Sequence, residues 1–167
     1  MLTLYLHIPF CKARCSYCDF YLVTGTEHID AFFSALSLET ASRSADLKGR
    51  TVGAIHIGGG TPSMVPVHYL AGWLEHIASL CSFTPDIEIA LEANPEDLGG
   101  KKMDELRAAG ITRLSIGAQS FMPAKLFFIV SGAHQYGPEP CTQTTLNIKC
   151  FISDKKRCAS VNNKPFG

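Results

Sequence analysis

Short strand-type runs alternate with helical patterns from residue 2 to about residue 117, and this alternation limits the fold more than any other feature of the sequence. The strand-type runs are residues 2–8, 51–57, 86–91 and 113–117. Chains with this pattern form a parallel sheet whose strands are joined by right-handed crossovers. We therefore expect an α/β fold of about four βα units, either an open Rossmann-like sheet or part of a (β/α) barrel. Four strands cannot close a barrel, so we expect any barrel to be incomplete.

Three segments between these runs carry apolar residues at helical spacing. They are residues 29–36, 66–77 and 103–109. Pro66 fits the first turn of the second helix, where its missing N–H leaves no hydrogen bond unmade. Gly110 fits the position just beyond the C-terminus of the third helix.

The residues with chemical potential follow the predicted strands. Cysteines follow the first strand, residues 58–60 (Gly-Gly-Gly) end the second, Glu92 follows the third and Gln119 follows the fourth. The carboxyl ends of parallel strands lie at one edge of a sheet, and ligands bind there in both candidate folds. We therefore expect one site at that edge.

Composition restricts the partners and the compartment. The 15 basic and 15 acidic residues balance, so we expect no nucleic acid partner. We expect neither a signal peptide nor a transmembrane segment, because no apolar run approaches the roughly 18 residues that span a bilayer. A cytoplasmic, reducing location follows as the expectation. The chain has seven cysteines, three of them within eight residues, which in a reducing compartment indicates metal or redox chemistry.

Cys11, Cys15 and Cys18 form a C-x3-C-x2-C run. Closely spaced thiolates can hold a [4Fe–4S] cluster, and three ligands leave the fourth iron open to chelate S-adenosylmethionine (SAM). A zinc site would need a fourth ligand, for which His7 is a nearby candidate. Purely structural cysteines are the other alternative. We favour the cluster.

The remaining candidates have simpler explanations of their own. The glycine triplet could meet a ligand carboxylate with its N–H groups, or form only a tight turn. Glu92 could pair with a cationic ligand, or end a strand in solvent. Tyr17 could stack on adenine or merely pack. His7 and His56, which lie in apolar strands, are expected to be core histidines with satisfied hydrogen bonds.

Six segments together resemble the radical SAM family of the heme chaperone HemW and oxygen-independent coproporphyrinogen III oxidase. They are residues 5–11 (YLHIPFC), 15–20 (CSYCDF), 57–63 (IGGGTPS), 91–95 (LEANP), 106–110 (LRAAG) and 113–121 (RLSIGAQSF). The resemblance implies that residues 1–121 are the N-terminal part of a radical SAM core domain, an incomplete (β/α) barrel.

The resemblance also implies roles for individual residues. Cluster ligands would be Cys11, Cys15 and Cys18. Tyr5 and Tyr17 would lie beside SAM. The methionine end of SAM would be lined by Gly59, Gly60 and Thr61, Glu92 would contact SAM, and Gln119 would face the cofactor pocket.

The two branches of the family differ in chemistry, and two features favour the chaperone. The oxidase pattern usually has a further cysteine two positions beyond the third, where this chain has Phe20. The oxidase also usually has a longer leader before the cluster, whereas this chain starts almost on its first predicted strand. The chaperone reading implies heme as a further ligand, with an electron donor and a heme acceptor as partners. The alternatives are porphyrinogen oxidation and an inactive fragment.

Residues 122–167 do not continue the resemblance. The family has a Leu-Gly-Arg-x-His segment where this chain has residues 127–134 (FFIVSGAH). We expect a divergent, weakly structured tail, arising from natural truncation or, as we prefer, from a shifted reading frame. A four-strand fragment with a free edge is expected to dissolve poorly or to dimerise unless the tail covers that edge.

Overall fold

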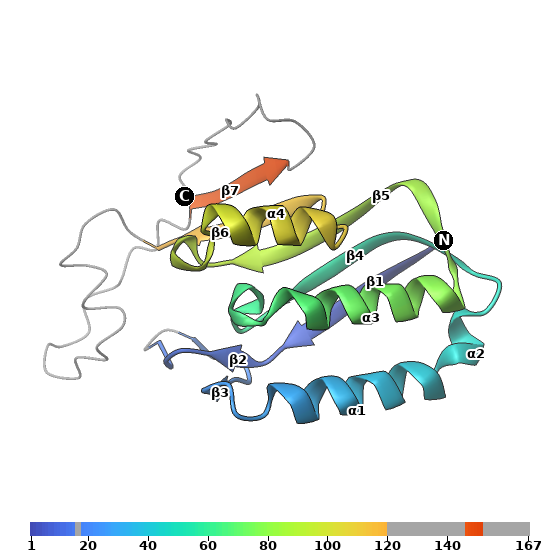
Figure 1. Ribbon diagram of the computed structural model, residues 1–167, viewed down its shortest axis with the longest axis horizontal. Helices are drawn as coiled ribbons and strands as arrows, with labels where there is room; N and C mark the ends of the chain where they lie inside the picture. The colour runs from blue at the N-terminus through green and yellow to red at the C-terminus, as the bar shows by residue number, and fades with distance from the viewer. Residues whose placement is uncertain (16–17, 120–145, 152–167) are drawn as a thin grey trace, which may run out of the picture.

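Four parallel strands form the centre of a mixed sheet in the computed structural model, which describes residues 1–15, 18–119 and 146–151 (Figure 1). They are β1 (Leu2–Ile8), β4 (Thr51–Gly59), β5 (Ser82–Ala93) and β6 (Arg113–Ala118). These strands lie side by side in chain order, and each neighbouring pair is parallel. The predicted α/β fold with a parallel sheet is confirmed.

The predicted strands match the observed ones most closely where no proline intervenes. The first has the predicted bounds, whereas β5 begins earlier, at Ser82. Pairing with β4 passes from Val52↔Phe83 to Ala54↔Glu88, so residues 84–87 form an irregularity opposite Gly53. Pro85 lies in this irregularity and cannot donate a ladder hydrogen bond. The sequence therefore shows only the regular part of the strand.

The helices lie along one face of the sheet (Figure 1). They are α1 (Ile29–Ser42), α3 (Val67–Leu80) and α4 (Gly100–Ala108), with the short α2 (Ser44–Leu47) after α1. Pro66 is the residue just before α3, one position earlier than expected. Gly110 follows α4 with a φ of +94°, as predicted. None of the helices within the described ranges has the length and apolar character needed to cross a bilayer.

The core lies between the sheet and these helices. Alternate residues of β1, such as Leu6 and Ile8, are buried against it, while Tyr5 on the other face is 58% exposed. Burying an aliphatic side chain of this size contributes about 1.5–3 kcal/mol. Within the core, Trp73 Nε1 of α3 donates a hydrogen bond to Thr40 Oγ1 of α1 at 3.2 Å, which ties the two helices together.

The sequence did not predict the strand β7 (Leu146–Phe151), which pairs antiparallel with β6. Its run Leu-Asn-Ile-Lys-Cys-Phe alternates between apolar and polar residues at first, which is the period of a strand. This pairing covers the edge of β6. The other residues of the expected 122–167 tail, and its boundary with the core domain, lie outside the described residues.

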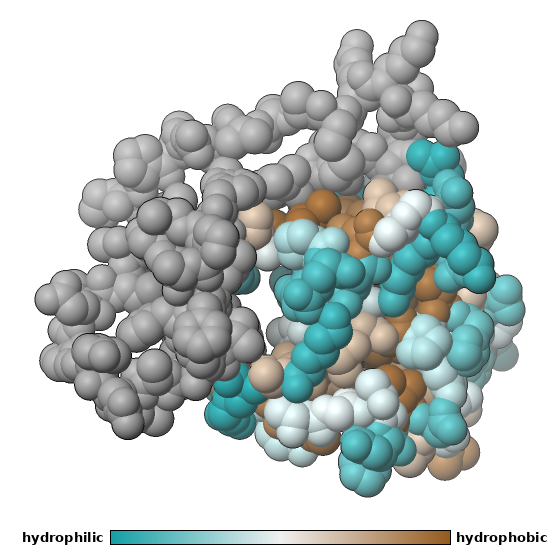
Figure 2. Space-filling view, turned by 60° about the vertical axis from the view of Figure 1, so that its left-hand side comes forward, coloured by the Kyte–Doolittle hydropathy of each residue, from teal (hydrophilic) through white to brown (hydrophobic). Residues whose placement is uncertain are grey.

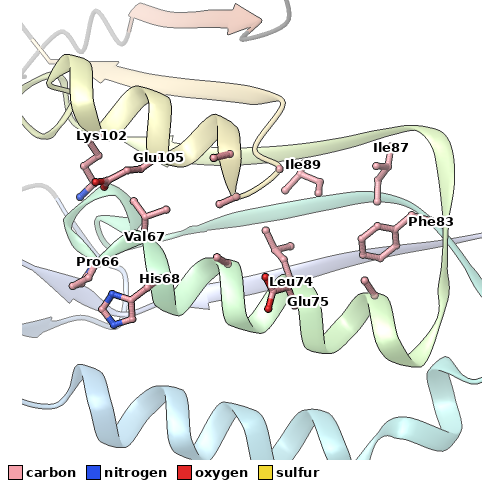
Figure 3. A pocket seen from close by; sticks show the side chains of 15 residues that line it. Pro66, Val67, His68, Leu74, Glu75, Phe83, Ile87, Ile89, Lys102 and Glu105 are labelled. Atoms are coloured by element: carbon pink, nitrogen blue, oxygen red, sulfur yellow. The ribbon is translucent and has the colours of Figure 1, made fainter.

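The surface combines polar side chains with visible apolar ones, as Figure 2 shows for one side of the molecule. One groove of about 850 Å³ lies between α3 and α4, with Phe83, Ile87 and Ile89 of β5 in its lining (Figure 3). The described candidate residues are absent from this lining. The groove therefore lies apart from the predicted site.

Candidate functional site

The three clustered cysteines lie on one loop at the carboxyl end of β1. Two short strands, β2 (Phe10–Cys11) and β3 (Val23–Thr24), pair with each other and close this loop at its base. The backbone N–H of Val23 donates to Pro9 O at 2.7 Å, and that of Gly25 donates to Cys11 O at 3.1 Å. We call residues 11–22, which begin with the last residue of β2, the cysteine loop. Its closed base holds Cys11 beside the sheet.

The three thiol groups of this loop differ in burial. Cys11 is buried, Cys15 and Cys18 are half-buried, and all three are free. Burial raises the pKa of the Cys11 thiol most, and the neighbouring Cys18 and Cys15 raise it further. Thr61 opposes this shift, because its hydroxyl donates to Cys11 Sγ at 3.4 Å. The Thr61 hydroxyl thus stabilises a thiolate at this position.

The donor set fits an iron–sulfur cluster by its chemistry. Three soft thiolates on one loop are the ligands that such a cluster takes. Among the described side chains, no group of three His, Cys, Asp or Glu residues is already arranged around a metal-sized space. The role of the three thiols as cluster ligands therefore stays a prediction.

The glycine triplet packs directly against the cysteine loop. The N–H groups of Gly60 and Thr61 donate to Ile8 O and Phe10 O, each at 2.7 Å. A Cβ atom on Gly60 would lie 2.7 Å from Phe10 O and 3.0 Å from Cys11 Sγ, closer than real Cβ atoms approach backbone oxygen. The φ of Gly59 is +110°, a conformation that favours glycine. The triplet is thus both a turn and a close support for Cys11.

Glu92 lies near the end of β5, on the face away from the helices. Its Oε2 accepts a hydrogen bond from the Gly59 N–H at 3.1 Å, and its Oε1 lies 3.2 Å from His56 Nε2. The side chain is 41% exposed. Glu92 is therefore neither a solvated strand end nor a buried charge without partners. It links β5 to the glycine triplet.

Tyr5 and His56 extend the same polar face. Their rings stack with centroids 5.8 Å apart and planes 13° apart. Partial burial raises the pKa of the Tyr5 hydroxyl, and the charge of Glu92 raises it further. The expectation that His56 is a core residue is wrong, because its side chain is 36% exposed on this face. It lies there because Ile55 and Ile57, its neighbours in β4, take the core-facing positions.

His7 uses both ring nitrogens within the protein. The Tyr5 hydroxyl donates to Nδ1 at 3.1 Å, and Nε2 donates to the backbone carbonyl of Tyr21 at 3.2 Å. A zinc ligand needs one nitrogen free. The arrangement therefore disfavours His7 as a fourth zinc ligand. The prediction of a core histidine with satisfied hydrogen bonds is right about the hydrogen bonds of His7 and wrong about its burial, since the residue is half-buried on the polar face.

The last two candidates are Gln119 and Tyr17. Gln119 follows β6 and is half-buried, and its Nε2 lies 2.9 Å from where a Cβ of Gly117 would stand. This places the amide beside the end of β6, and its role toward a cofactor stays a prediction. Tyr17 lies outside the described residues.

Sequence reasoning missed the polar contacts that join the cysteine loop to the segments after β4 and β5. Lys12 in the cysteine loop forms ion pairs with Glu96 and Asp97, which lie between β5 and α4. Ser63, which follows the glycine triplet, donates to Asp97 Oδ2 at 2.7 Å. Nothing in the local sequence signals these contacts, because their partners are far apart in the chain.

The cysteine loop, the glycine turn and Glu92 thus lie at the ends of successive parallel strands. Residues 5–136 match the model of the Radical SAM superfamily, and the chain belongs to this superfamily. The family implies a [4Fe–4S] cluster and SAM.

Its relatives within the superfamily include both branches considered above. Heme chaperone HemW from Mycobacterium tuberculosis is 40% identical over 126 residues, which cover 73% of this chain and 32% of that protein. Oxygen-independent coproporphyrinogen III oxidase from Escherichia coli is 36% identical over 122 residues, covering 72% of this chain and 27% of the oxidase. The solved structure of the E. coli oxidase matches with a TM-score of 0.71 and 32% identity, covering 76% of this chain and 30% of that one. The chain thus spans about a third of the length of these relatives.

Proposed function

We propose that this chain carries the cluster- and SAM-binding part of a HemW-like heme chaperone. The observation that carries the proposal is the direct packing of the cysteine loop on the glycine triplet, with Cys11 Sγ next to Gly60 and hydrogen-bonded to Thr61. This packing brings the Cys11 thiol, the backbone of the glycine triplet and the Glu92 carboxylate into one small region. Such a region suits a ligand with a sulfonium, an amino group and a carboxylate.

The chain's own residues have distinct tasks in this proposal. Cys11, Cys15 and Cys18 hold the cluster, which supplies an electron to the sulfonium of SAM when both are bound. The Thr61 hydroxyl stabilises the Cys11 thiolate. Loss of the protons from these thiols accompanies binding of the cluster, and a reducing, cytoplasmic location suits thiols that must stay free for it.

SAM would lie along the polar face of the sheet. Gly59 and Gly60 present backbone close to the site, and Glu92 offers a negative charge to the ammonium group or the ribose hydroxyls of SAM. Tyr5 provides an exposed ring beside this carboxylate. Tyr17 and Gln119 complete the set that the family resemblance implies.

The choice between chaperone and oxidase depends on Phe20. This residue is 61% exposed at the end of the cysteine loop, at the position where the oxidase pattern has a further cysteine. The HemW relatives support the same branch. The second candidate is coproporphyrinogen oxidation, which the structural match to the E. coli oxidase supports. Heme or a porphyrinogen, an electron donor and a heme acceptor are the partners proposed.

The cluster is tested by anaerobic reconstitution of the chain. We expect about four iron and four sulfide per chain, and cleavage of SAM to 5′-deoxyadenosine on reduction. The triple variant Cys11→Ala, Cys15→Ala, Cys18→Ala should lose both. Cys81→Ala is the matched control, because Cys81 is a free cysteine outside the loop and should not affect iron content. Full iron content in the triple variant would contradict the proposal.

The branch is tested with heme and porphyrinogen in parallel. We expect added heme to shift its Soret band on binding to the reconstituted chain, and coproporphyrinogen to remain unconverted with SAM and reductant present. Turnover of coproporphyrinogen would instead support the oxidase.

A further inference from the structure

Lys12 connects the cysteine loop to a distant turn. Its Nζ lies 2.7 Å from Asp97 Oδ1 and 2.8 Å from Glu96 Oε1. Both carboxylates belong to the short helix η2 (Pro95–Asp97), between β5 and α4. Lys12 directly follows Cys11, the buried thiol of the site. Lys12 therefore connects the start of the cysteine loop to this turn.

Asp97 is held more firmly than Glu96. The Asp97 side chain is only 8% exposed, whereas that of Glu96 is 62% exposed. The second oxygen of Asp97 accepts a hydrogen bond from Ser63 Oγ at 2.7 Å. A buried charge with fixed partners contributes more to positioning than an ion pair in solvent does. The Lys12–Asp97 pair should thus contribute more to the position of the loop than the Lys12–Glu96 pair does.

Ser63 ties this carboxylate to the other strand ends. Its hydroxyl oxygen accepts a hydrogen bond from the Asn94 N–H at 3.0 Å, at the end of β5. Its backbone carbonyl accepts a hydrogen bond from Lys102 Nζ of α4. Asp97 therefore belongs to a polar network that joins the loops after β4 and β5.

We propose that Lys12 and Asp97 are positioning residues that fasten the cysteine loop to this network and so set the spacing of the cluster ligands. The proposal rests on the proposed function for its meaning, but the contact itself can be tested without the cluster. We call the contact the Lys12–Asp97 latch. It fastens the start of the loop, while His7 fastens the end through Tyr21 O.

The first measurement uses the chain without iron. We compare alkylation rates of Cys15 and Cys18 by iodoacetamide, with peptide mass spectrometry to assign each site. Lys12→Met and Asp97→Asn should each raise these rates roughly fivefold, since the loop opens more often. Lys12→Arg should retain the protected rate, and Glu96→Gln is the matched control, expected to stay within about twofold. Cys81 serves as an internal reporter of global unfolding.

The second measurement follows loss of the reconstituted cluster to a chelator by its visible absorbance. The same two variants should lose it about tenfold faster than the unchanged chain. The double variant should be no worse than either single one, because both changes remove one contact. An unchanged chain that takes up no iron would overturn the proposed function, while the alkylation result would still decide on the latch.

Two results overturn the latch. One is alkylation of Cys15 and Cys18 that stays within about twofold of the unchanged chain in both Lys12→Met and Asp97→Asn. The other is a parallel rise at Cys81, which would mean that these variants loosen the whole fold. The proposal is supported if the alkylation rate rises only at Cys15 and Cys18 in these two variants and stays at the unchanged chain's rate in Lys12→Arg.

Discussion

At the scale of single residues, Glu92 is the point where the sheet meets the candidate cofactor region. Both of its carboxylate oxygens are engaged, one by the Gly59 N–H and the other near His56. The side chain nevertheless remains partly exposed, so a ligand can still reach it. A residue that both orders the glycine triplet and faces solvent is suited to join ligand binding to the geometry of the turn.

Glu92→Gln should weaken SAM binding to the reconstituted chain by roughly tenfold, because the neutral amide loses the charge that a cationic ligand meets. Titration followed by electron paramagnetic resonance of the reduced cluster measures this. Glu88→Gln is the matched control. It lies on the same face of β5 but pairs with Arg113 at 2.8 Å, and SAM binding should stay within about twofold. Equal weakening in both variants would argue against a role for Glu92.

The residue scale also shows where sequence reasoning stops. The cysteine run and Glu92 were predictable, because each follows a strand and the spacing of the thiols is itself informative. Lys12 was not, since its partner Asp97 lies 85 residues away and an isolated lysine carries no local signal. The burial of His56 was misjudged because an apolar strand hides which of its two faces is covered.

At the scale of elements, the end of β4 and the start of the cysteine loop form one packed unit. Hydrogen bonds from Gly60 and Thr61 to the residues before Cys11 leave little room for any side chain between them. Strand β1 was predicted to the residue because its apolar residues alternate evenly. The start of β5 was not, because Pro85 interrupts its pairing, and β7 was not, because the segment around it lacks a strand–helix rhythm.

Gly60→Ala should lower the free energy of unfolding by about 1–3 kcal/mol, because its Cβ would displace the backbone at Phe10 or the thiol of Cys11. It should also lower the iron content after reconstitution. Urea unfolding followed by the fluorescence of the single tryptophan, Trp73, gives the first quantity.

Gly72→Ala is the control for this prediction. Gly72 lies inside α3, and in the described part of the chain no atom beyond its chain neighbours and its own helix backbone lies within 4 Å of the place that an added methyl group would take. Alanine should therefore stabilise the helix by about 0.5–1 kcal/mol without affecting iron. A Gly60→Ala chain as stable as the unchanged one would show that the turn can relax around a methyl group.

At the scale of the whole molecule, the sheet ends in β1 on one side and in β7 on the other. Strand β7 pairs with β6, whereas the outer edge of β1 has no strand partner within the ranges that the structure describes. A hollow of about 830 Å³ lies beside this edge, between β1 and α1, and leucines of β1 contribute to its lining. Unpaired edges beside apolar surface favour association between chains.

We therefore expect concentration-dependent dimers or larger species in sedimentation velocity. Thr3→Lys should reduce them, because a charge on an exposed position of an edge strand disfavours pairing. Thr51→Lys, an exposed residue of the inner strand β4, should leave association unchanged. A single monomeric species at all concentrations would contradict the expectation for the open edge.

The long reach of the Lys12–Asp97 contact has a consequence for biosynthesis. The cysteines are translated early, but Asp97, whose carboxylate holds their loop, lies 85 residues after Lys12 in the chain. Until translation has passed that carboxylate, the nascent cysteines have no such anchor. The proposed cluster would therefore be inserted at a late stage of synthesis, after the Lys12–Asp97 contact has formed.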